Sequence, residues 1–600
     1  MRIGLLTEGG YPYAGGEAGL WCDRLVRGLA QHDFDLYALA RDREQEEAGL
    51  LALPPQVRRV RTARLWTDAG SEDGVRGGAL GRRARRRFAT LYQELASAVV
   101  HGAGFEAAGE GSGGAGGALG VRGAPVEADR FATALYGLAE LARDEGPLHV
   151  ALRSETAVRI LERACRAPGA LRAARAARVP DLLVCAGHIE RALRPLSLDW
   201  YADPHEGEAA GGLGSVDLCH ATSGGAAALP GLLAKRFHGV PLLVTEYGVR
   251  LRAQYLAAGD AELSAPVRAL LASFHGLLAA EVYRQATVIT PGDAHARRWQ
   301  ERCGADRAKM RTVHPGMDAS RFAEVGEREE PGEPGTLVWV GRVEPAKDLI
   351  SLLHAFAEIR KEEPEARLRI VETMPVRPGP AEAGTYLGHC KALAAQLFPD
   401  EAAGMHAVGE NPVSFEELGD PGASDLAEVY GAGSVVVLSS VVEGFPVSLV
   451  EAMFCGRATV STDVGAVVEA IGGTGLVVPP RNPRALAEAC VALLRDSGRR
   501  ERLGAAARAR ALELFTVEQN VAAFHSIYLD IVSHCPVRRD AMDDAGDPLP
   551  FSHPAEAHVP GHWAARTSGP SRLPSWAPSA EGGRREQLAG VSQGGGEGRA

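Results

Sequence analysis

The sequence predicts an α/β protein made of two Rossmann-like, doubly wound halves that face a central cleft. Its 600 residues exceed what one hydrophobic core usually organises. An apolar run at residues 2–7, a glycine-rich turn and an amphipathic helical pattern at 18–30 form the start of a β-α-β unit. The same rhythm begins afresh at residues 335–341, which indicates a second parallel sheet.

Strands are expected wherever a short apolar run ends in a polar or glycine-rich turn. In the first half these runs are residues 2–7, 34–40, 181–186, 217–220, 241–245 and 287–290. In the second half they are residues 335–341, 367–372, 434–440, 457–462 and 475–479, followed by a helical region at 483–532. A linker rich in proline and glycine at 315–335 divides the chain into the domains that we expect, namely 1–320, 335–500 and closing helices at 501–535.

Three segments interrupt this alternation of strands and helices. Residues 102–123 contain ten glycines and are expected to form a flexible insertion. Residues 541–600 contain seventeen glycines and prolines, which predicts a disordered tail. The arginine cluster at 82–87 fits a solvated helix face better than a nucleic-acid patch.

Composition and charge argue against several classes of protein. The net charge of −11 gives no global basic footprint for nucleic acid, so no nucleic-acid partner is expected. No apolar run reaches the ~18 residues that a membrane-spanning helix needs. The apolar stretch after Arg2 is too short for a signal peptide, so we expect a cytoplasmic protein. Nine scattered cysteines predict neither disulfides nor a metal site, and no cofactor is expected.

The glycines near the N-terminus do not match the two commonest phosphate-binding motifs. No lysine is followed by serine or threonine, so the Walker A motif is absent. The glycines also lack the G-x-G-x-x-G spacing of dinucleotide sites. Gly15 and Gly16 can still bring the backbone close to an anion at a helix N-terminus, or they form a tight turn and nothing more.

Two glutamates follow the buried strand at 434–440. Glu443 lies in the loop after this strand, and Glu451 lies inside the helix expected at 446–454. Because ligands of parallel sheets bind at the carboxyl ends of the strands, both carboxylates can face that crevice and accept hydrogen bonds from sugar hydroxyls. The alternative is a pair of solvated acidic residues.

Two cations lie at the turn between the strand at 335–341 and the next helix. Arg342 and Lys347 are five residues apart, and Lys347 is one of only five lysines in the chain. An arginine and a lysine so placed can clamp a diphosphate and neutralise it as it leaves. The turn is therefore a candidate donor-phosphate site.

Together these motifs resemble the retaining glycosyltransferases of family 4, which have the GT-B fold. The resemblance rests on the turn at 341–347, on the spacing of Glu443 and Glu451, and on the strand that ends in His220. The opening segment and the turn at 245–248 resemble more narrowly the subgroup that contains the cytoplasmic glycosyltransferase of Pel exopolysaccharide synthesis.

The resemblance implies a role for each of these side chains. Arg342 and Lys347 would bind the donor diphosphate, Glu451 the ribose hydroxyls and Glu443 the donor sugar. His220 would reach the sugar near the reacting carbon, although a lone histidine is more often structural.

The resemblance extends to three further positions. Asn411 belongs to a segment, 408–413, that resembles the loop packed on the nucleotide base. Gly15 and Gly16 would lie against the diphosphate or the acceptor. Tyr247 departs from the subgroup, in which histidine is common at this position, and receives no catalytic role.

The activity implied is transfer of a hexose, with retention, from a nucleoside-diphosphate sugar to a glycan, polysaccharide or small-molecule acceptor. A UDP-sugar is the favoured donor, and no metal is required. Further implied partners are the membrane subunits of polysaccharide assembly, with a peripheral location at the inner face of the membrane. The alternatives are a sugar-nucleotide epimerase or hydrolase of the same fold, and a non-catalytic nucleotide-sugar-binding subunit.

Overall fold

The computed structural model places most of the chain in helices and strands. The residues that it describes are 1–13, 17–65, 80–102, 124–201, 212–249, 252, 263–328, 332–373, 381–398, 411–420, 422–537, 541–542 and 548–549. Residues Met1–Arg539 form one compact unit, whereas Asp540–Ala600 form another, in which the strands β13 (Ala541–Met542) and β14 (Pro548–Leu549) pair antiparallel. The flexible insertion and the disordered tail expected from the sequence lie almost entirely outside the described residues.

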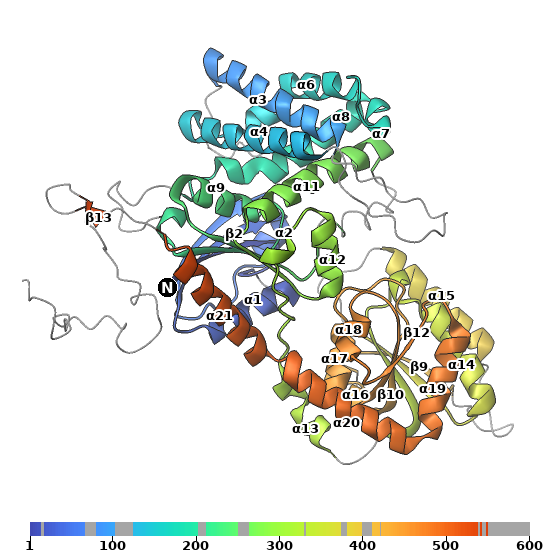
Figure 1. Ribbon diagram of the computed structural model, residues 1–600. Helices are drawn as coiled ribbons and strands as arrows, with labels where there is room; N and C mark the ends of the chain where they lie inside the picture. Colours follow the sequence, from blue (N-terminus) through green and yellow to red (C-terminus); the bar gives the residue numbers. More distant parts are fainter. Residues whose placement is uncertain are drawn as a thin grey trace, which may run out of the picture. The chain divides into compact units, whose positions relative to one another are not determined.

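The first half contains the sheet that is labelled at β2 in Figure 1. Its six strands are parallel and have the order β3-β2-β1-β4-β5-β6. The predicted β-α-β start is confirmed, because β1 pairs in register with β2 along its whole length. The strands are β1 (Arg2–Glu8), β2 (Asp33–Ala40), β3 (Val57–Arg64), β4 (Leu218–Ala221), β5 (Leu242–Glu246) and β6 (Val288–Pro291). The helices next to this sheet in the chain are α1 (Glu17–Gly28), α2 (Arg43–Glu47), α9 (Ala228–His238), α11 (Ala265–Gln285) and α12 (Ala294–Arg302).

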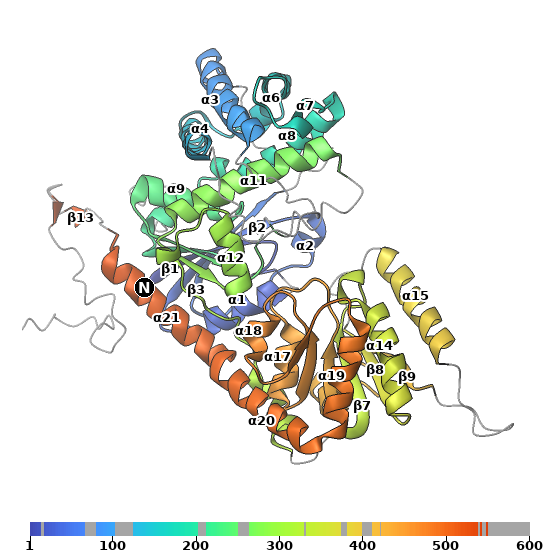
Figure 2. The ribbon, with the colours of Figure 1, turned by 45° about the vertical axis from the view of Figure 1, so that its right-hand side comes forward.

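A helical insertion separates β3 from β4 in the chain and packs on α11, on the side away from the sheet (Figure 2). It consists of α3 (Arg82–His101), α4 (Ala124–Glu145), α5 (His149–Leu152), α6 (Glu155–Cys165), α7 (Arg172–Arg175) and α8 (Val179–Leu193). The solvated helix face predicted for the arginine cluster is confirmed, because all five arginines of residues 82–87 are exposed at the start of α3.

The strand predicted at residues 181–186 is wrong, because these residues lie inside α8. The run is continuously apolar, and such a run fits a buried strand and a buried helix equally well. Pro180 stands in the first turn of the helix, and the Asp181 carboxylate accepts a hydrogen bond from the Arg178 backbone N–H at 2.8 Å. These two start signals favour a helix.

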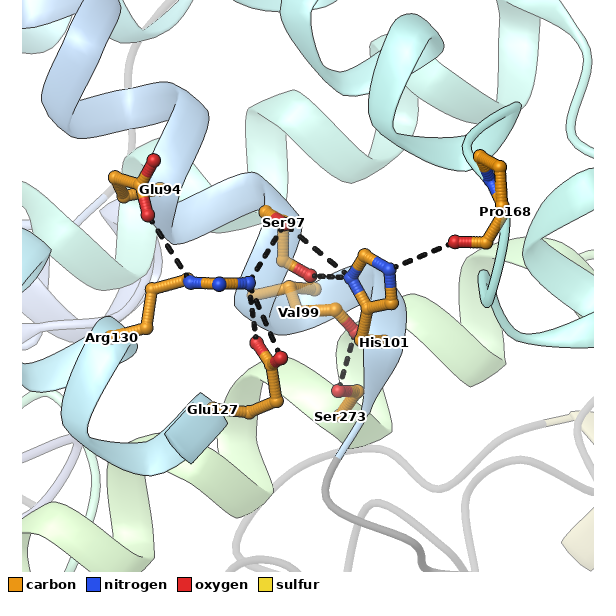
Figure 3. A network of polar contacts seen from close by, with 8 residues as sticks. All are labelled: Glu94, Ser97, Val99, His101, Glu127, Arg130, Pro168 and Ser273. Atoms are coloured by element: carbon orange, nitrogen blue, oxygen red, sulfur yellow. Dashed lines mark hydrogen bonds and ion pairs between the residues drawn. The ribbon is translucent and has the colours of Figure 1, made fainter. Parts of the chain in front are cut away.

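Polar contacts connect the helices of the insertion to one another and to α11 (Figure 3). The His101 Nε2 atom at the end of α3 lies 3.1 Å from the Pro168 carbonyl oxygen, and Arg130 of α4 pairs with Glu94 at 3.2 Å. The Ser273 hydroxyl of α11 donates a hydrogen bond to the Val99 carbonyl at 2.6 Å. These contacts accompany a continuous apolar core that the insertion shares with the first sheet.

The second half contains another six-stranded parallel sheet, with the order β12-β11-β10-β7-β8-β9. Its strands are β7 (Glu333–Gly341), β8 (Arg367–Glu372), β9 (Val413–Glu417), β10 (Gly433–Leu438), β11 (Ala458–Thr462) and β12 (Leu476–Val478). Its helices are α13 (Ala323–Glu327), α14 (Leu349–Glu362), α15 (Ala381–Leu397), α16 (Leu426–Ala432), α17 (Val447–Phe454), α18 (Val467–Ile471), α19 (Pro483–Arg495) and α20 (Ser497–Leu514). The predicted pair of doubly wound sheets is therefore confirmed.

The last long helix, α21 (Val517–His534), belongs to the core of the first half although it ends the compact unit (Figure 1). It packs against α1, and its buried Phe524 and Tyr528 join Trp21 in one apolar cluster. The preceding helix α20 packs instead on α17 and β11 of the second half. The C-terminal helices thus contact both sheets.

Candidate active site

A cavity of about 750 Å³ lies at the carboxyl edge of the first sheet and extends to α17 of the second half. This is where ligands of doubly wound sheets bind. Residues that follow β1, β2, β4 and β5 form one wall, and the segment after β6 forms another. The lining residues are Thr7, Glu8, Gly10, Tyr11, Leu20, Trp21, Cys22, Arg24, Arg41, Thr222, Ser223, Thr245, Tyr247, Gly248, Pro315, Gly316, Met317, Asp318, Arg321, Phe322, Phe445, Val447 and Glu451.

Glu451 is the one sequence-predicted site residue among these lining residues. The Tyr430 hydroxyl donates a hydrogen bond to its Oε2 atom at 2.8 Å. Burial, and then the nearby Glu451 carboxylate, hold the pKa of Tyr430 well above its usual value, so the phenol remains a neutral donor. The tyrosine therefore fixes one oxygen of a carboxylate that faces the cavity.

Glu443 and Lys347 lie close together, although the resemblance implies different contacts for them, with the donor sugar for Glu443 and with the diphosphate for Lys347. The Lys347 Nζ atom lies 2.6 Å from Glu443 Oε2, and both side chains are largely buried. The Ser440 hydroxyl donates to the same oxygen at 3.0 Å, and the Gly444 backbone N–H donates to Oε1 at 3.2 Å. The two loops that carry the ion pair are joined by the Val441 backbone N–H, which donates to the Ala346 carbonyl at 2.9 Å.

Arg342 and Asn411 do not line the cavity. The Arg342 side chain is 64% exposed, and its nearest carboxylate is Glu344 at 3.8 Å. The Asn411 side chain instead starts β9: its Oδ1 accepts from the Val413 backbone N–H at 2.9 Å. Its Nδ2 donates to the Phe398 carbonyl at 3.3 Å. Their expected contacts with a nucleotide stay predictions.

Gly15 and Gly16, and residues 408–410 of the expected base-binding loop, lie outside the described residues. Gly10, six residues before Gly16, does line the cavity.

His220 does not reach the cavity in this structure. Its ring is fully buried, with Nδ1 2.7 Å from the Tyr528 hydroxyl and Nε2 2.7 Å from the Thr245 hydroxyl. The imidazole contacts two residues that line the cavity, Thr245 through this hydrogen bond and Trp21 edge to face, but it does not line the cavity itself. The expected contact with a donor sugar stays a prediction, and the placement corresponds to the structural histidine named as its alternative.

Burial lowers the pKa of His220 to about 3, so the ring stays neutral while the unfolded chain protonates below about pH 6.5. Between pH 6.5 and 3 the unfolded state therefore binds more protons than the folded state. As the pH is lowered through this range, the free energy of unfolding should fall by about 1.4 kcal/mol per pH unit from this residue alone. Urea unfolding at pH 7 and at pH 5.5 should show this slope reduced in His220→Gln. In His534→Gln, which changes an exposed histidine, the slope should be retained; an unchanged slope in His220→Gln would contradict the prediction.

A buried asparagine of α21, which the sequence analysis did not single out, holds the aromatic wall of the cavity. The Asn520 Oδ1 atom accepts from the Trp21 indole N–H at 3.1 Å, and its Nδ2 donates to the Tyr247 hydroxyl at 2.9 Å and to the His314 carbonyl at 2.6 Å. Trp21 and Tyr247 meet edge to face with ring centroids 4.9 Å apart. The Asn520 amide thus connects α1, the turn after β5 and the segment after β6.

Replacing Asn520 with alanine should lower the free energy of unfolding by about 2 to 4 kcal/mol, since three buried hydrogen bonds are lost and their partners stay buried. Denaturant unfolding measures the effect. Gln519→Ala is the matched control, because Gln519 is the exposed neighbour on the same helix. If Asn520→Ala lowered the free energy of unfolding by less than about 1 kcal/mol, as a surface substitution does, the hydrogen bonds of Asn520 would add little stability.

A second buried carboxylate positions the loop after β4. Glu246 accepts hydrogen bonds from the Gly224 backbone N–H at 2.8 Å, from the Gln300 amide at 3.2 Å and from the Tyr283 hydroxyl. The loop that Glu246 fixes in this way places Thr222 and Ser223 at the cavity. Glu246 thus acts on the cavity through this backbone.

Two hydrogen bonds connect the first sheet's loops to the second half near this site. The Arg252 guanidinium donates to the Glu443 carbonyl at 2.9 Å, and the Ala294 backbone N–H donates to the Glu469 carboxylate at 2.6 Å. Within the described part of the chain, no three or more histidine, cysteine, aspartate or glutamate side chains gather as metal ligands.

The chain resembles known proteins over both halves. Residues 334–496 match the profile described as Glycosyl transferases group 1. The D-inositol 3-phosphate glycosyltransferases of Kineococcus radiotolerans and Kribbella flavida are each 31% identical, over 37% and 46% of this chain. These alignments cover 52% and 63% of the two relatives, so the chain spans less than two thirds of their length.

A solved structure supports the fold. Sucrose-phosphate synthase from Thermosynechococcus elongatus superimposes with a TM-score of 0.50 at 16% identity, and the match covers 89% of this chain and 99% of that one. With the two six-stranded parallel sheets, this likeness shows the GT-B fold. The profile described as Domain of unknown function (DUF3492) matches residues 1–308, which is just over half of the chain, and the protein therefore belongs to that family.

Proposed function

We propose that the protein is a glycosyltransferase that moves a hexose, with retention, from a nucleoside-diphosphate sugar to a glycan, polysaccharide or small-molecule acceptor. A UDP-sugar is the proposed donor. The donor would bind on the second half and the acceptor at the wall formed by the first half. The narrower resemblance to the Pel exopolysaccharide subgroup supports a polysaccharide product.

The observation that carries the proposal is the grouping of candidate donor residues at the start of α17. Glu451 lines the cavity, and an ion pair joins Glu443, in the loop before this helix, to Lys347, in the turn between β7 and α14. All three residues, and Arg342 with them, fall within residues 334–496, the segment that matches Glycosyl transferases group 1. The match and the geometry therefore both support a donor site in the second half.

The chemistry proposed needs a leaving group that is stabilised as charge develops. The bond from the anomeric carbon to the diphosphate breaks, and a bond from that carbon to the acceptor oxygen forms on the same face. The acceptor's proton passes to the departing phosphate oxygen. Lys347 and Arg342 would supply positive charge to that phosphate, so no metal is required for this step.

The Lys347 ion pair has a consequence for donor binding. In the structure the Nζ atom is matched by one carboxylate, and an incoming diphosphate would compete with Glu443 for it. As the lysine turns toward phosphate, the Glu443 oxygens become available to sugar hydroxyls. The pair would thus keep both groups oriented until the donor arrives.

The location proposed is the cytoplasm, peripheral at the inner face of the membrane, with membrane subunits of polysaccharide assembly as partners. Among the described residues, no helix combines the length and apolar character needed to cross a bilayer.

The deciding experiment incubates the protein with UDP-, GDP- and ADP-sugars, with and without candidate acceptors and in the presence of EDTA. Free sugar, epimerised donor and transferred product are each measured by chromatography, and the anomeric configuration of the product by NMR. Transfer with retention that persists in EDTA supports the proposal. Epimer alone would assign an epimerase, and tight donor binding without turnover would assign a binding subunit.

A further inference from the structure

The last two helices of the insertion carry a basic and apolar face that no described residue covers. The face combines arginines at and just after α7 with one side of α8. Figure 2 shows where these two helices lie in the insertion. It lies in the helical insertion, outside the cavity and its lining residues.

The apolar part of this face follows helical spacing along α8. Val179 and Leu183 are each 56% exposed, and Val184 is 41% exposed. Residues 179, 183, 184 and 187 lie on one side of an α-helix, because four residues make slightly more than one turn. At Gly187 an added side chain would meet open space, so this side is uncovered along two turns. The opposite side of α8, with Leu182 and Ile189, is buried.

The basic part consists of Arg172, Arg175, Arg178 and Arg191, all exposed. Within the described residues, no carboxylate forms an ion pair with these four guanidinium groups. By contrast, Arg159 of α6 and Arg166 just after it pair with Glu155 and Glu162 at 2.5 and 2.6 Å.

The two acidic residues of this stretch offset only part of the positive charge. The Glu190 carboxylate is buried and pairs with Arg194 at 2.5 Å. The Asp181 carboxylate accepts from the Ser264 hydroxyl at 2.6 Å and from the Arg178 backbone N–H at 2.8 Å, and it lies near enough to Arg178 to offset the charge of that arginine. The face therefore carries positive charge in a protein whose net charge is −11.

We propose that this α7–α8 face docks the protein peripherally on an anionic lipid membrane. Arginines attract acidic headgroups, and the exposed leucine and valines enter the boundary between headgroups and acyl chains. Residues 172–191 contain no phenylalanine, tyrosine or tryptophan on which a nucleic-acid base could stack, and the imidazole of His188 is partly buried. The three exposed apolar side chains of this face are also far fewer than the ~20 residues that each side of a stable protein interface contributes, which argues against a protein partner.

The surface is independent of the proposed glycosyl transfer, and its test needs no substrate. The full chain is sedimented with vesicles of phosphatidylcholine alone and with vesicles of phosphatidylcholine and phosphatidylglycerol in equal parts, at low and high salt. Binding is expected only to the vesicles with phosphatidylglycerol, and high salt should release the protein because the attraction is screened. No binding to these vesicles at low salt would overturn the proposal.

Substitutions then locate the surface. Arg172→Gln combined with Arg175→Gln should weaken partitioning by about 30-fold, since each arginine near an anionic surface contributes about one factor of five. Arg484→Gln combined with Arg495→Gln makes the same charge change on exposed residues of α19, and should leave partitioning within about threefold. Equal weakening by both pairs would mean that net charge, and not this face, binds the vesicles.

The apolar contribution has its own matched pair. Leu183→Ser should weaken partitioning by about tenfold, because a half-exposed leucine no longer enters the bilayer. Leu512→Ser changes an exposed leucine of α20 and should have no effect. Binding of a labelled oligonucleotide is measured as well. If Leu183→Ser left vesicle binding unchanged and the double substitution of Arg172 and Arg175 abolished oligonucleotide binding, the partner would be a nucleic acid and the lipid assignment would be wrong. Circular dichroism of each variant should match that of the unchanged protein.

Discussion

Replacing Lys347 with alanine is expected to lower kcat/KM for the sugar donor by about 100-fold, the scale seen when one preorganised donor to a developing anion is lost. The Lys347 ammonium is largely buried, and its ion pair with Glu443 at 2.6 Å holds it at the start of the donor loops. Alanine removes the cation that would neutralise the leaving diphosphate and also leaves the Glu443 carboxylate without its counter-charge. Steady-state kinetics of donor hydrolysis and transfer measure the effect.

Two further variants make this result specific. Lys347→Arg keeps the charge but changes its geometry, and it should recover part of the lost activity. Lys361→Ala removes an exposed lysine of α14 that pairs with Glu358, and kcat/KM should be unchanged. If nucleotide affinity by calorimetry and turnover were both unaffected in Lys347→Ala, the donor site would have to lie elsewhere.

Much of the fold follows from local patterns in the sequence. The apolar run that becomes β7 and the β-branched run that becomes β10 identify buried parallel strands. The turn after β7 places Lys347, and the turn after β10 places Glu443, at the carboxyl edge of the sheet. The periodic run from residue 18 gives α1 within a few residues of its observed bounds. Local propensity and burial agree in these segments, so the pattern is decisive.

Local patterns give less information where the partners are distant in the chain. The Lys347 to Glu443 ion pair joins residues 96 positions apart, and the hydrogen bond from Trp21 to Asn520 joins residues 499 positions apart. The strand predicted at 181–186 is wrong because its apolar run lacks any alternation that would separate strand from helix. The burial of His220 depends on Tyr528 of α21, a contact that only the tertiary fold creates.

The two glutamates near α17 are expected to contribute to different stages of the reaction. Glu451 faces the cavity and is fixed by the Tyr430 hydroxyl, so its contact with ribose would exist in donor complex, transition state and nucleotide product alike. Glu443 is paired with Lys347 ahead of the helix and would contact only the sugar. An interaction present throughout changes binding, whereas one that strengthens in the transition state changes kcat.

Substituting each glutamate with glutamine separates the two roles without a large change in shape. Glu451→Gln should weaken binding of the free nucleoside diphosphate by roughly 1.5 to 3 kcal/mol, the scale of a hydrogen bond to a charged group. Glu443→Gln should leave that affinity within about threefold and lower kcat by about 100-fold, because the sugar carries its charge only near the transition state. Glu488→Gln, an exposed glutamate of α19, is the matched control and should change neither value.

The measurement is calorimetric titration of all three variants with UDP and GDP, beside steady-state kinetics on the sugar donor. Within that threefold limit, the released Lys347 ammonium in Glu443→Gln should strengthen nucleoside diphosphate binding, because its competing carboxylate is gone. Tighter nucleotide binding together with lower kcat in Glu443→Gln would therefore identify both the sugar contact and the lysine exchange. Equal losses of nucleotide affinity in Glu443→Gln and Glu451→Gln, or no loss in either, would remove this division of roles and leave the pair as part of the helix start alone.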